Sequence, residues 1–248
     1  MPKFFTAREN IADSELIINN EDVNHISRVL WLKEGDKITV CDGQGYDYNV
    51  TIKTIEPKEI ICSIDEKIKC DTEANISVTL FQGIPKAGKM DYIIQKTTEL
   101  GIVRIVPVAL ERCVVKLENQ KAEAKKQERW QKIANSAAKQ SGRGIVPEIT
   151  MPVSLDTALK MASELDLCFA PYECEEQKHL KEVLTSKENV KTIGFIIGPE
   201  GGFDVSETEK IKSAGFETVT LGRRILRTET AGEAVLAMVM YELGDING

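Results

Sequence analysis

The chain has 248 residues, of which 42% are hydrophobic, and its net charge is −7 at pH 7. This composition allows one large domain or two smaller ones, and it excludes a disordered chain. The acidic charge argues against a protein that coats nucleic acid non-specifically, but it permits a local basic face. No apolar run approaches the ~20 residues that a membrane span needs, and the N-terminus lacks the apolar core of a signal sequence.

The cysteines and histidines argue against a metal site. The six cysteines form no Cys-x-x-Cys pair, and the chain has only two histidines, His25 and His179. We therefore expect no bound metal, no membrane segment and a cytoplasmic protein with reduced thiols.

The first ~70 residues predict a small all-β domain. Strands are expected over 37–41, 46–55 and 60–64, separated by turns rich in Gly, Asp and Pro. A short helix is expected over 22–30, with Asp22 as its N-cap. Short strands at this spacing indicate a small barrel. The polar stretch 67–75 is expected to separate two domains, 1–70 and 71–248.

From residue 76 onward, strands alternate with helices. The expected strands are 76–81, 103–110, 167–170, 192–197 and 219–221. The expected helices are 91–100, 117–141, 155–161, 205–214 and 230–243. Asp204 with Glu207, and Thr230 with Glu233, stand at capping-box spacing. This alternation predicts an α/β domain with a mostly parallel sheet.

A basic stretch lies inside the longest expected helix. Between Lys121 and Arg143 the sequence carries seven lysines and arginines against two glutamates. Taken alone, this pattern favours a solvated helix face over a nucleic-acid surface.

Two polar turns follow apolar, strand-like runs near the C-terminus. The first is Gly198-Pro199-Glu200-Gly201-Gly202, and the second runs from Leu221 to Ala231 with three arginines. Polar turns after buried strands predict one ligand site at an edge of the sheet, and the arginines indicate a phosphate-bearing partner. Neither turn matches a dinucleotide or P-loop motif. The first turn alone is also compatible with an ordinary strand-to-helix connection.

Further motifs make a family resemblance close. In chain order they are Lys86-x-x-Lys89-Met90, Thr98-Glu99-Leu100-Gly101, Glu111-Arg112-Cys113, Arg129-Trp130, Ser141-Gly142-Arg143 and Leu226-Arg227-Thr228-Glu229-Thr230-Ala231. The chain resembles, over nearly its whole length, the RsmE family of SPOUT-class methyltransferases, which methylate N3 of a uridine in bacterial 16S rRNA. The resemblance implies an N-terminal PUA-like β-barrel and a C-terminal SPOUT α/β domain ending in a trefoil knot. It also implies a homodimer that acts on the small ribosomal subunit.

The resemblance implies S-adenosylmethionine as the cofactor, held by the two turns. The expected cofactor-binding residues are Gly198, Pro199, Glu200, Gly201, Gly202, Leu221, Gly222, Ile225, Leu226, Arg227 and Thr228. The apolar members suit an adenine slot. Removing the uracil N3 proton places negative charge on the ring, which Arg224 and Arg227 would stabilise, with Arg223 less securely matched. Glu229 or Glu99 could act as the base, although Glu229 is at least as well explained as a helix N-terminal carboxylate.

The RNA contacts are expected from both domains. They are Arg8, His25, Arg28, Lys86, Lys89, Arg112 and Arg143. His25 is equally compatible with a packed helix residue. Similar proteins often have a basic residue where this chain has Trp31, so that contact is either lost or replaced by base stacking. Two alternatives remain: another SPOUT methyltransferase, acting on a ribose 2′-oxygen or on tRNA, and a catalytically silent rRNA-binding assembly factor.

Overall fold

The computed structural model describes residues 3–114 and 119–246. The chain divides into two compact units, Met1–Glu73 with Ala138–Val146, and Ala74–Ala137 with Pro147–Gly248. The division falls within helix α3 (Gln120–Ser141), so the last turn of α3 belongs to the first unit. The domain limits 1–70 and 71–248 stay a prediction.

The first unit is built on one five-stranded sheet. Its strands are β1 (Lys3–Phe5), β2 (Glu15–Ile18), β3 (Lys37–Cys41), β4 (Tyr46–Ile55) and β5 (Ile60–Lys69). Their order is β1-β3-β4-β5-β2, and every neighbouring pair is antiparallel except β1 with β3. Residues 37–41 and 46–55 are strands as predicted, whereas β5 continues five residues beyond the predicted 60–64. The strands β1 and β2 were not predicted, because three or four residues are too few to show alternation.

Helical turns complete the first unit. They are a 3₁₀ turn (Arg8–Asn10), α1 (Asp22–Asn24) and a π-helical segment (His25–Val29). The predicted N-cap at Asp22 is wrong, because Glu21 holds that position. The Asp22 carboxylate instead accepts hydrogen bonds from Lys139 Nζ, at 3.0 Å to each oxygen. A buried acid paired with a distant lysine cannot be told from a cap by local spacing.

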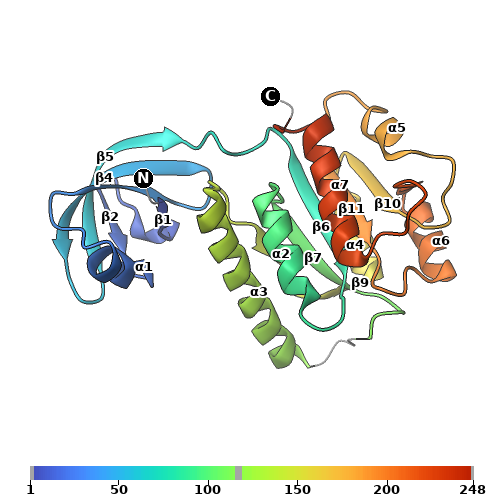
Figure 1. Cartoon of the computed structure of the whole chain (residues 1–248), viewed down its shortest axis with the longest axis horizontal. Helices are drawn as coiled ribbons and strands as arrows, with labels where there is room; N and C mark the ends of the chain where they lie inside the picture. Colours follow the sequence, from blue (N-terminus) through green and yellow to red (C-terminus); the bar gives the residue numbers. More distant parts are fainter. Residues whose placement is uncertain (1–2, 115–118, 247–248) are drawn as a thin grey trace. The chain divides into compact units, whose positions relative to one another are not determined.

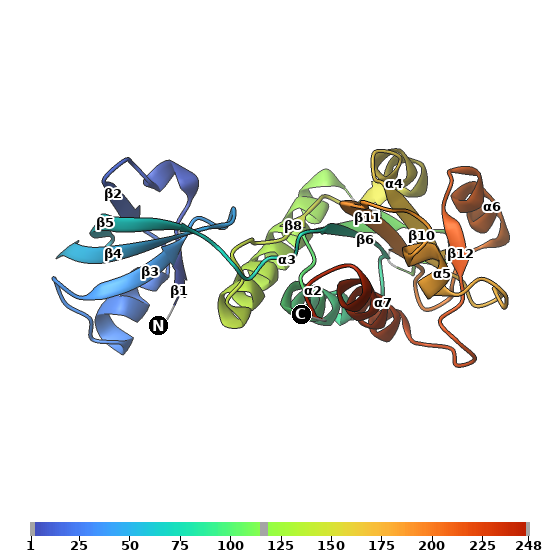
Figure 2. The ribbon, with the colours of Figure 1, turned by 90° about the horizontal axis from the view of Figure 1, so that it is seen from above.

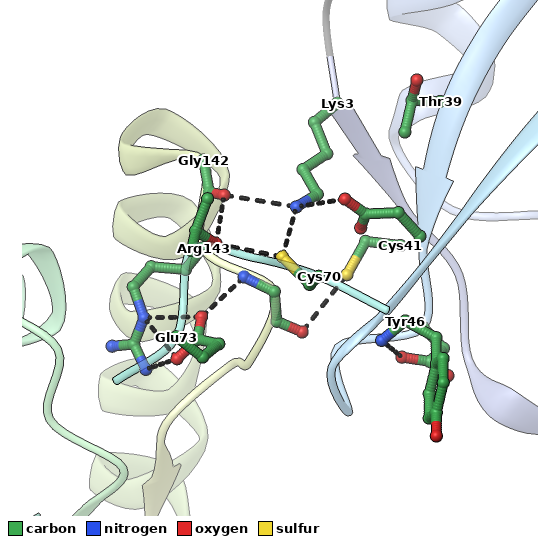
Figure 3. A network of polar contacts seen from close by, with 12 residues as sticks. Lys3, Thr39, Cys41, Tyr46, Cys70, Glu73, Gly142 and Arg143 are labelled. Carbon is green, nitrogen blue, oxygen red and sulfur yellow. Dashed lines mark hydrogen bonds and ion pairs between the residues drawn. The ribbon is translucent and has the colours of Figure 1, made fainter. Parts of the chain in front are cut away.

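A buried ion pair joins the two stretches of the first unit (Figure 3). The Arg143 guanidinium is 4% exposed and lies 2.6 Å from a carboxylate oxygen of Glu73, which is 13% exposed. The other Glu73 oxygen accepts hydrogen bonds from the backbone N–H groups of Gly144 and Ile145, at 2.7 and 3.0 Å. Lys3 Nζ adds a hydrogen bond to the carbonyl of Gly142. One carboxylate therefore satisfies a buried charge and two backbone donors at once.

The second unit contains a parallel sheet. Its strands are β6 (Ser77–Gly83), β7 (Arg104–Ala109), β8 (Glu148–Ile149), β9 (Val153–Ser154), β10 (Leu167–Pro171), β11 (Thr192–Ile197) and β12 (Glu217–Val219). The order is β12-β10-β11-β6-β7-β8, with β9 beside β7, and every recorded pairing is parallel. The predicted mostly parallel sheet is confirmed.

Helices cover both faces of this sheet (Figures 1 and 2). They are α2 (Lys89–Glu99), α3, α4 (Leu155–Ala162), α5 (Leu180–Leu184), α6 (Val205–Ser213) and α7 (Thr228–Glu242). Successive side chains of β11 point to opposite faces of the sheet. Phe195 packs in the core under α2, α5 and α7, whereas Ile196 packs in the core under α4 and α6. No helix of the described residues is long and apolar enough to cross a membrane.

The helix boundaries show which local signals are reliable. The capping box of Asp204 and Glu207 is present at the start of α6. The one predicted at Thr230 and Glu233 is wrong, because α7 begins two residues earlier and Arg227 is its N-cap. The predicted strand 219–221 lies at 217–219, and α5, β8 and β9 were too short to predict. The first residues of the predicted helix 117–141, 117 and 118, lie outside the described residues. The trefoil knot stays a prediction.

Replacing Glu73 with Ala should destabilise the first unit by about 3–5 kcal/mol, because it leaves the Arg143 charge buried without its partner. The control is Glu15→Ala, which breaks an ion pair of the same unit whose side chains are 48% and 49% exposed. That change should cost at most about 1 kcal/mol. Hydrogen exchange of the β3 and β4 amides measures both opening free energies. Equal effects would show that the buried pair does not hold the unit together.

Candidate functional site

A cavity of about 940 Å³ opens at the carboxyl ends of β10, β11 and β12. Its walls come from the segments that follow these strands, within 171–179, 197–203 and 220–231, and from Lys89 at the start of α2. Carboxyl ends of parallel strands meet at one edge of a sheet, which is where α/β proteins bind ligands. The two predicted turns therefore line one cavity.

The third wall was not predicted. Strand β10 lies between β11 and β12, so the segment after β10 enters the cavity between the two turns. This segment brings Glu173, Glu175, Glu176 and His179. The order of strands in a sheet is not visible in the order of the chain, and no local motif marks this segment.

The hydroxyl of Thr228 joins the walls of the cavity. It donates a hydrogen bond of 2.7 Å to the carbonyl of Gly198 and accepts one of 2.9 Å from the side-chain amide of Gln82. Gln82 is fully buried, and its amide also donates to the carbonyl of Gly83. The end of β6, the first turn and the start of α7 are thereby fixed to one another.

The structure brings together most residues predicted to bind the cofactor. Those that line the cavity are Gly198, Pro199, Glu200, Gly202, Leu221, Gly222, Ile225, Leu226, Arg227 and Thr228. Gly201 is not among them: its carbonyl accepts a hydrogen bond from Arg112, and a Cβ there would lie 3.1 Å from the Arg112 Cβ. The left-handed backbone of the turn is at Gly202, with φ +68°.

The candidate catalytic residues differ in their surroundings. Arg224 and Arg227 line the cavity with exposed side chains, so both guanidinium groups are available to a ligand. Glu229 lies in the first turn of α7 and is half-buried, with one carboxylate oxygen 3.1 Å from Lys89 Nζ. Glu99, the other candidate base, ends α2 and forms an ion pair with Lys96 at 2.9 Å, and it does not line the cavity.

Lys89 lies between two carboxylates, at 3.2 Å from Glu200 and 3.1 Å from Glu229. Burial by itself would raise the pKa of Glu229. The hydrogen bond from its own backbone N–H and the Lys89 ammonium outweigh burial and lower that pKa below its usual range. The pKa of Glu200 is lowered against the effect of burial by the same kinds of contact. A carboxylate with a depressed pKa is a weak base, which favours a structural role for Glu229.

The predicted RNA contacts fall into two groups. Arg8, His25 and Arg28 are exposed on the first unit, where the Arg8 guanidinium donates to the Tyr48 hydroxyl at 3.0 Å. Trp31 is 76% exposed with φ +55°, a strained backbone for a tryptophan. Arg143 does not present a free charge, because it is buried against Glu73.

The remaining candidates surround the first turn. Lys86 is exposed, and its backbone N–H donates to the Glu200 carboxylate at 3.1 Å. Arg112 reaches the Gly201 carbonyl and Asp204. Lys89, which is predicted to contact RNA, lines the cavity itself. Among the described residues, no group of three or more His, Cys, Asp or Glu could hold a metal ion.

Comparison with known proteins defines the class. The RNA methyltransferase domain family matches residues 72–240, and the RNA methyltransferase PUA domain family matches residues 18–65. The fold is therefore that of an α/β RNA methyltransferase with an N-terminal PUA-like domain.

Individual relatives define the family. Ribosomal RNA small subunit methyltransferase E of Bacillus subtilis is 35% identical, with 93% of this chain and 91% of that protein covered. The corresponding protein of Aquifex aeolicus is 32% identical over 91% of this chain and 93% of its own. A Neisseria gonorrhoeae structure of the same name, bound to S-adenosylmethionine, has a TM-score of 0.86 and 33% identity, covering 99% of both chains. This chain belongs to the ribosomal RNA small subunit methyltransferase E family.

Thr228→Val should lower the free energy of unfolding by about 1–3 kcal/mol, because valine keeps the shape but leaves the Gly198 carbonyl and one Gln82 N–H without partners. Amide hydrogen exchange in 198–203 should rise in parallel. Thr230→Val, at an exposed position of the same helix, is the control and should change neither quantity. Unchanged exchange in the Thr228 variant would mean that its hydroxyl does not anchor the turn.

Lys89→Met should raise the pKa of both Glu229 and Glu200, because it removes the ammonium that lowers both pKa values, while burial and the backbone hydrogen bonds remain. Carbon-13 NMR titration of the carboxyl groups measures this change. Glu175 is the internal control, since its pKa is lowered by the Thr218 hydroxyl and by backbone N–H groups and not by Lys89. A variant in which Glu229 titrates as in the wild type would refute the assignment.

Proposed function

We propose that this protein transfers the methyl group of S-adenosylmethionine to N3 of a uridine in bacterial 16S rRNA. The observation that carries the proposal is the single cavity formed by the Gly198–Gly202 turn and the Leu221–Thr228 loop in a chain of this family. Its relatives are named as small-subunit rRNA methyltransferases, and one solved relative holds S-adenosylmethionine. A second, from Legionella pneumophila, was also solved with that cofactor and has a TM-score of 0.85 at 28% identity.

The cavity suits this cofactor in size and chemistry. Its volume of about 940 Å³ lies within the roughly 300–1,000 Å³ of small-molecule sites. Ile197, Leu221 and Leu226 offer apolar contacts for adenine, beside backbone groups that can pair with its edge. At Gly202 a Cβ would come within 2.9 Å of a carboxylate oxygen, so a side chain there would intrude on the wall.

The arginines account for the chemistry at the base. When bound, S-adenosylmethionine supplies an electrophilic methyl group on a sulfonium centre. Uracil N3 must lose its proton to accept that methyl group, and the negative charge then spreads to O2 and O4. Arg224 and Arg227 line the cavity with exposed guanidinium groups that can donate to those oxygens. The target uridine must be unstacked to reach the cavity.

The first unit is assigned to RNA positioning. Arg8, His25 and Arg28 are exposed there, and Trp31 offers a flat apolar face for stacking. On the second unit, Lys86 and Arg112 flank the first turn and would contact RNA near the cavity.

We also propose that the protein acts as a homodimer in the bacterial cytoplasm. Helices α2 and α7 contact each other, and they expose Tyr92, Met238 and Tyr241, whose side chains are 45%, 40% and 60% exposed. Apolar groups on neighbouring helices are suited to a subunit contact. Light scattering after gel filtration measures the oligomeric state.

A methyl-transfer assay on small ribosomal subunits that lack the modification tests the activity. Digestion of the product RNA should yield 3-methyluridine. A ribose-methylated nucleoside, or methylation of tRNA instead, would assign the chain to another activity of the same fold. Calorimetric titration with S-adenosylmethionine tests the non-enzymatic alternative, because an assembly factor without activity need not bind it.

Arg227→Ala should lower the single-turnover methylation rate by roughly 10²–10³-fold, the scale of losing one preorganised anion-stabilising donor. Arg227→Lys should recover only part of the rate, because lysine lacks the planar fork. Arg104→Ala, in an exposed ion pair away from the cavity, is the control. If Arg227 instead grips phosphate, RNA affinity and its salt dependence fall while the rate at saturating RNA holds. Wild-type behaviour in both measurements would show that the active site is misplaced.

A further inference from the structure

The segment after β10 places three glutamates on the cavity wall: Glu173, Glu175 and Glu176. Glu175 has a structural task. It accepts hydrogen bonds from the Thr218 hydroxyl at 2.8 Å and from the backbone N–H groups of Gln177 and Lys178. These contacts, the Thr218 hydroxyl first, lower the pKa of Glu175 and hold the segment against β12.

Glu173 has no such task. Its carboxylate lies against Gly202, so close that a Cβ on that glycine would be 2.9 and 3.0 Å from its two oxygens. Within the described residues, Glu173 has no hydrogen-bond or ion-pair partner. A carboxylate therefore lies beside the Gly-rich turn on the cavity wall, with both oxygens free to accept hydrogen bonds.

The other acid at this turn cannot serve a ligand in the same way. Glu200 is paired with Lys89 at 3.2 Å and accepts a hydrogen bond from the Lys86 backbone. The guanidinium groups of Arg223, Arg224 and Arg227 come from the loop after β12, which forms a different wall. Glu173 thus presents an uncompensated negative charge at the Gly202 side of the cavity, which suits a cationic group.

We propose that Glu173 binds the α-ammonium group of S-adenosylmethionine. This inference rests on the proposed function and adds the residue that recognises the amino-acid end of the cofactor. The cofactor carries two positive groups, but only the ammonium has N–H donors, whereas the sulfonium has none. A carboxylate gains charge-assisted hydrogen bonds from the ammonium alone, and these are among the strong ones.

Binding of the ammonium group determines how Glu173 affects the cofactor complexes before and after methyl transfer. The ammonium is present both in S-adenosylmethionine and in the product, S-adenosylhomocysteine. Glu173 therefore stabilises the substrate and product complexes alike. Its loss should raise KM for the cofactor and leave kcat nearly unchanged, which is the signature of uniform binding.

The experiment compares Glu173→Gln with the wild type by calorimetric titration of three ligands. S-adenosylmethionine carries both positive groups, S-adenosylhomocysteine only the ammonium, and 5′-methylthioadenosine neither. The matched control is Glu209→Gln, which removes one exposed negative charge from α6, outside the cavity wall. Both variants should keep the wild-type thermal unfolding midpoint, since Glu173 and Glu209 are exposed.

We expect Glu173→Gln to weaken S-adenosylmethionine and S-adenosylhomocysteine equally, each by about 10-fold or more, and to leave 5′-methylthioadenosine unchanged. A loss confined to S-adenosylmethionine would assign Glu173 to the sulfonium and overturn the inference. A loss for 5′-methylthioadenosine would place the carboxylate at the ribose and also overturn it. Equal affinities of variant and wild type for all three ligands would also overturn the inference. Failure of the wild type to bind S-adenosylmethionine would instead refute the proposed function.

Discussion

The cavity depends on the hydrogen bonds of one hydroxyl group, that of Thr228. It lies between the fully buried amide of Gln82 at the end of β6 and the carbonyl of Gly198 at the end of β11. Polar groups in a core are costly unless they are paired, so the three residues constrain one another. Because Thr228 also begins α7, the direction in which this helix leaves the cavity is set by the same contacts.

The walls of the cavity carry charged side chains of both signs. Lys89 holds Glu200 and Glu229 on one side and keeps both carboxylates ionised, with pKa values below their usual range. The loop after β12 presents arginines, and the segment after β10 presents glutamates. One cavity thus carries charge of both signs, which suits the proposed combination of a cationic cofactor and an anionic polynucleotide. A chain with a net charge of −7 can do this because the positive charge is local.

In the first unit, too, one side chain bonds several buried polar groups at once. Glu73 satisfies the buried Arg143 guanidinium and two backbone N–H groups that lie about seventy residues away in the chain. The basic stretch 121–143 is partly consumed in such contacts, because Arg129, Lys139 and Arg143 pair with Asp91, Asp22 and Glu73. Counting the charges along a helix therefore overstates the positive charge that is free to contact RNA.

The sequence by itself determined the elements with strong local signals. The strand 192–197 is an uncharged apolar run, β3 and β4 alternate between Gly-containing turns, and the capping box of Asp204 and Glu207 starts α6. It also supplied the two turns that line the cavity, since glycines and arginines after buried strands are a local pattern. Only the tertiary structure decided that β10 lies between β11 and β12, and so brought Glu173 to Gly202. It also removed Arg143 from the surface and placed Lys89 in the cavity wall. Those outcomes depend on pairings between residues far apart in the chain, and local spacing carries no information about them.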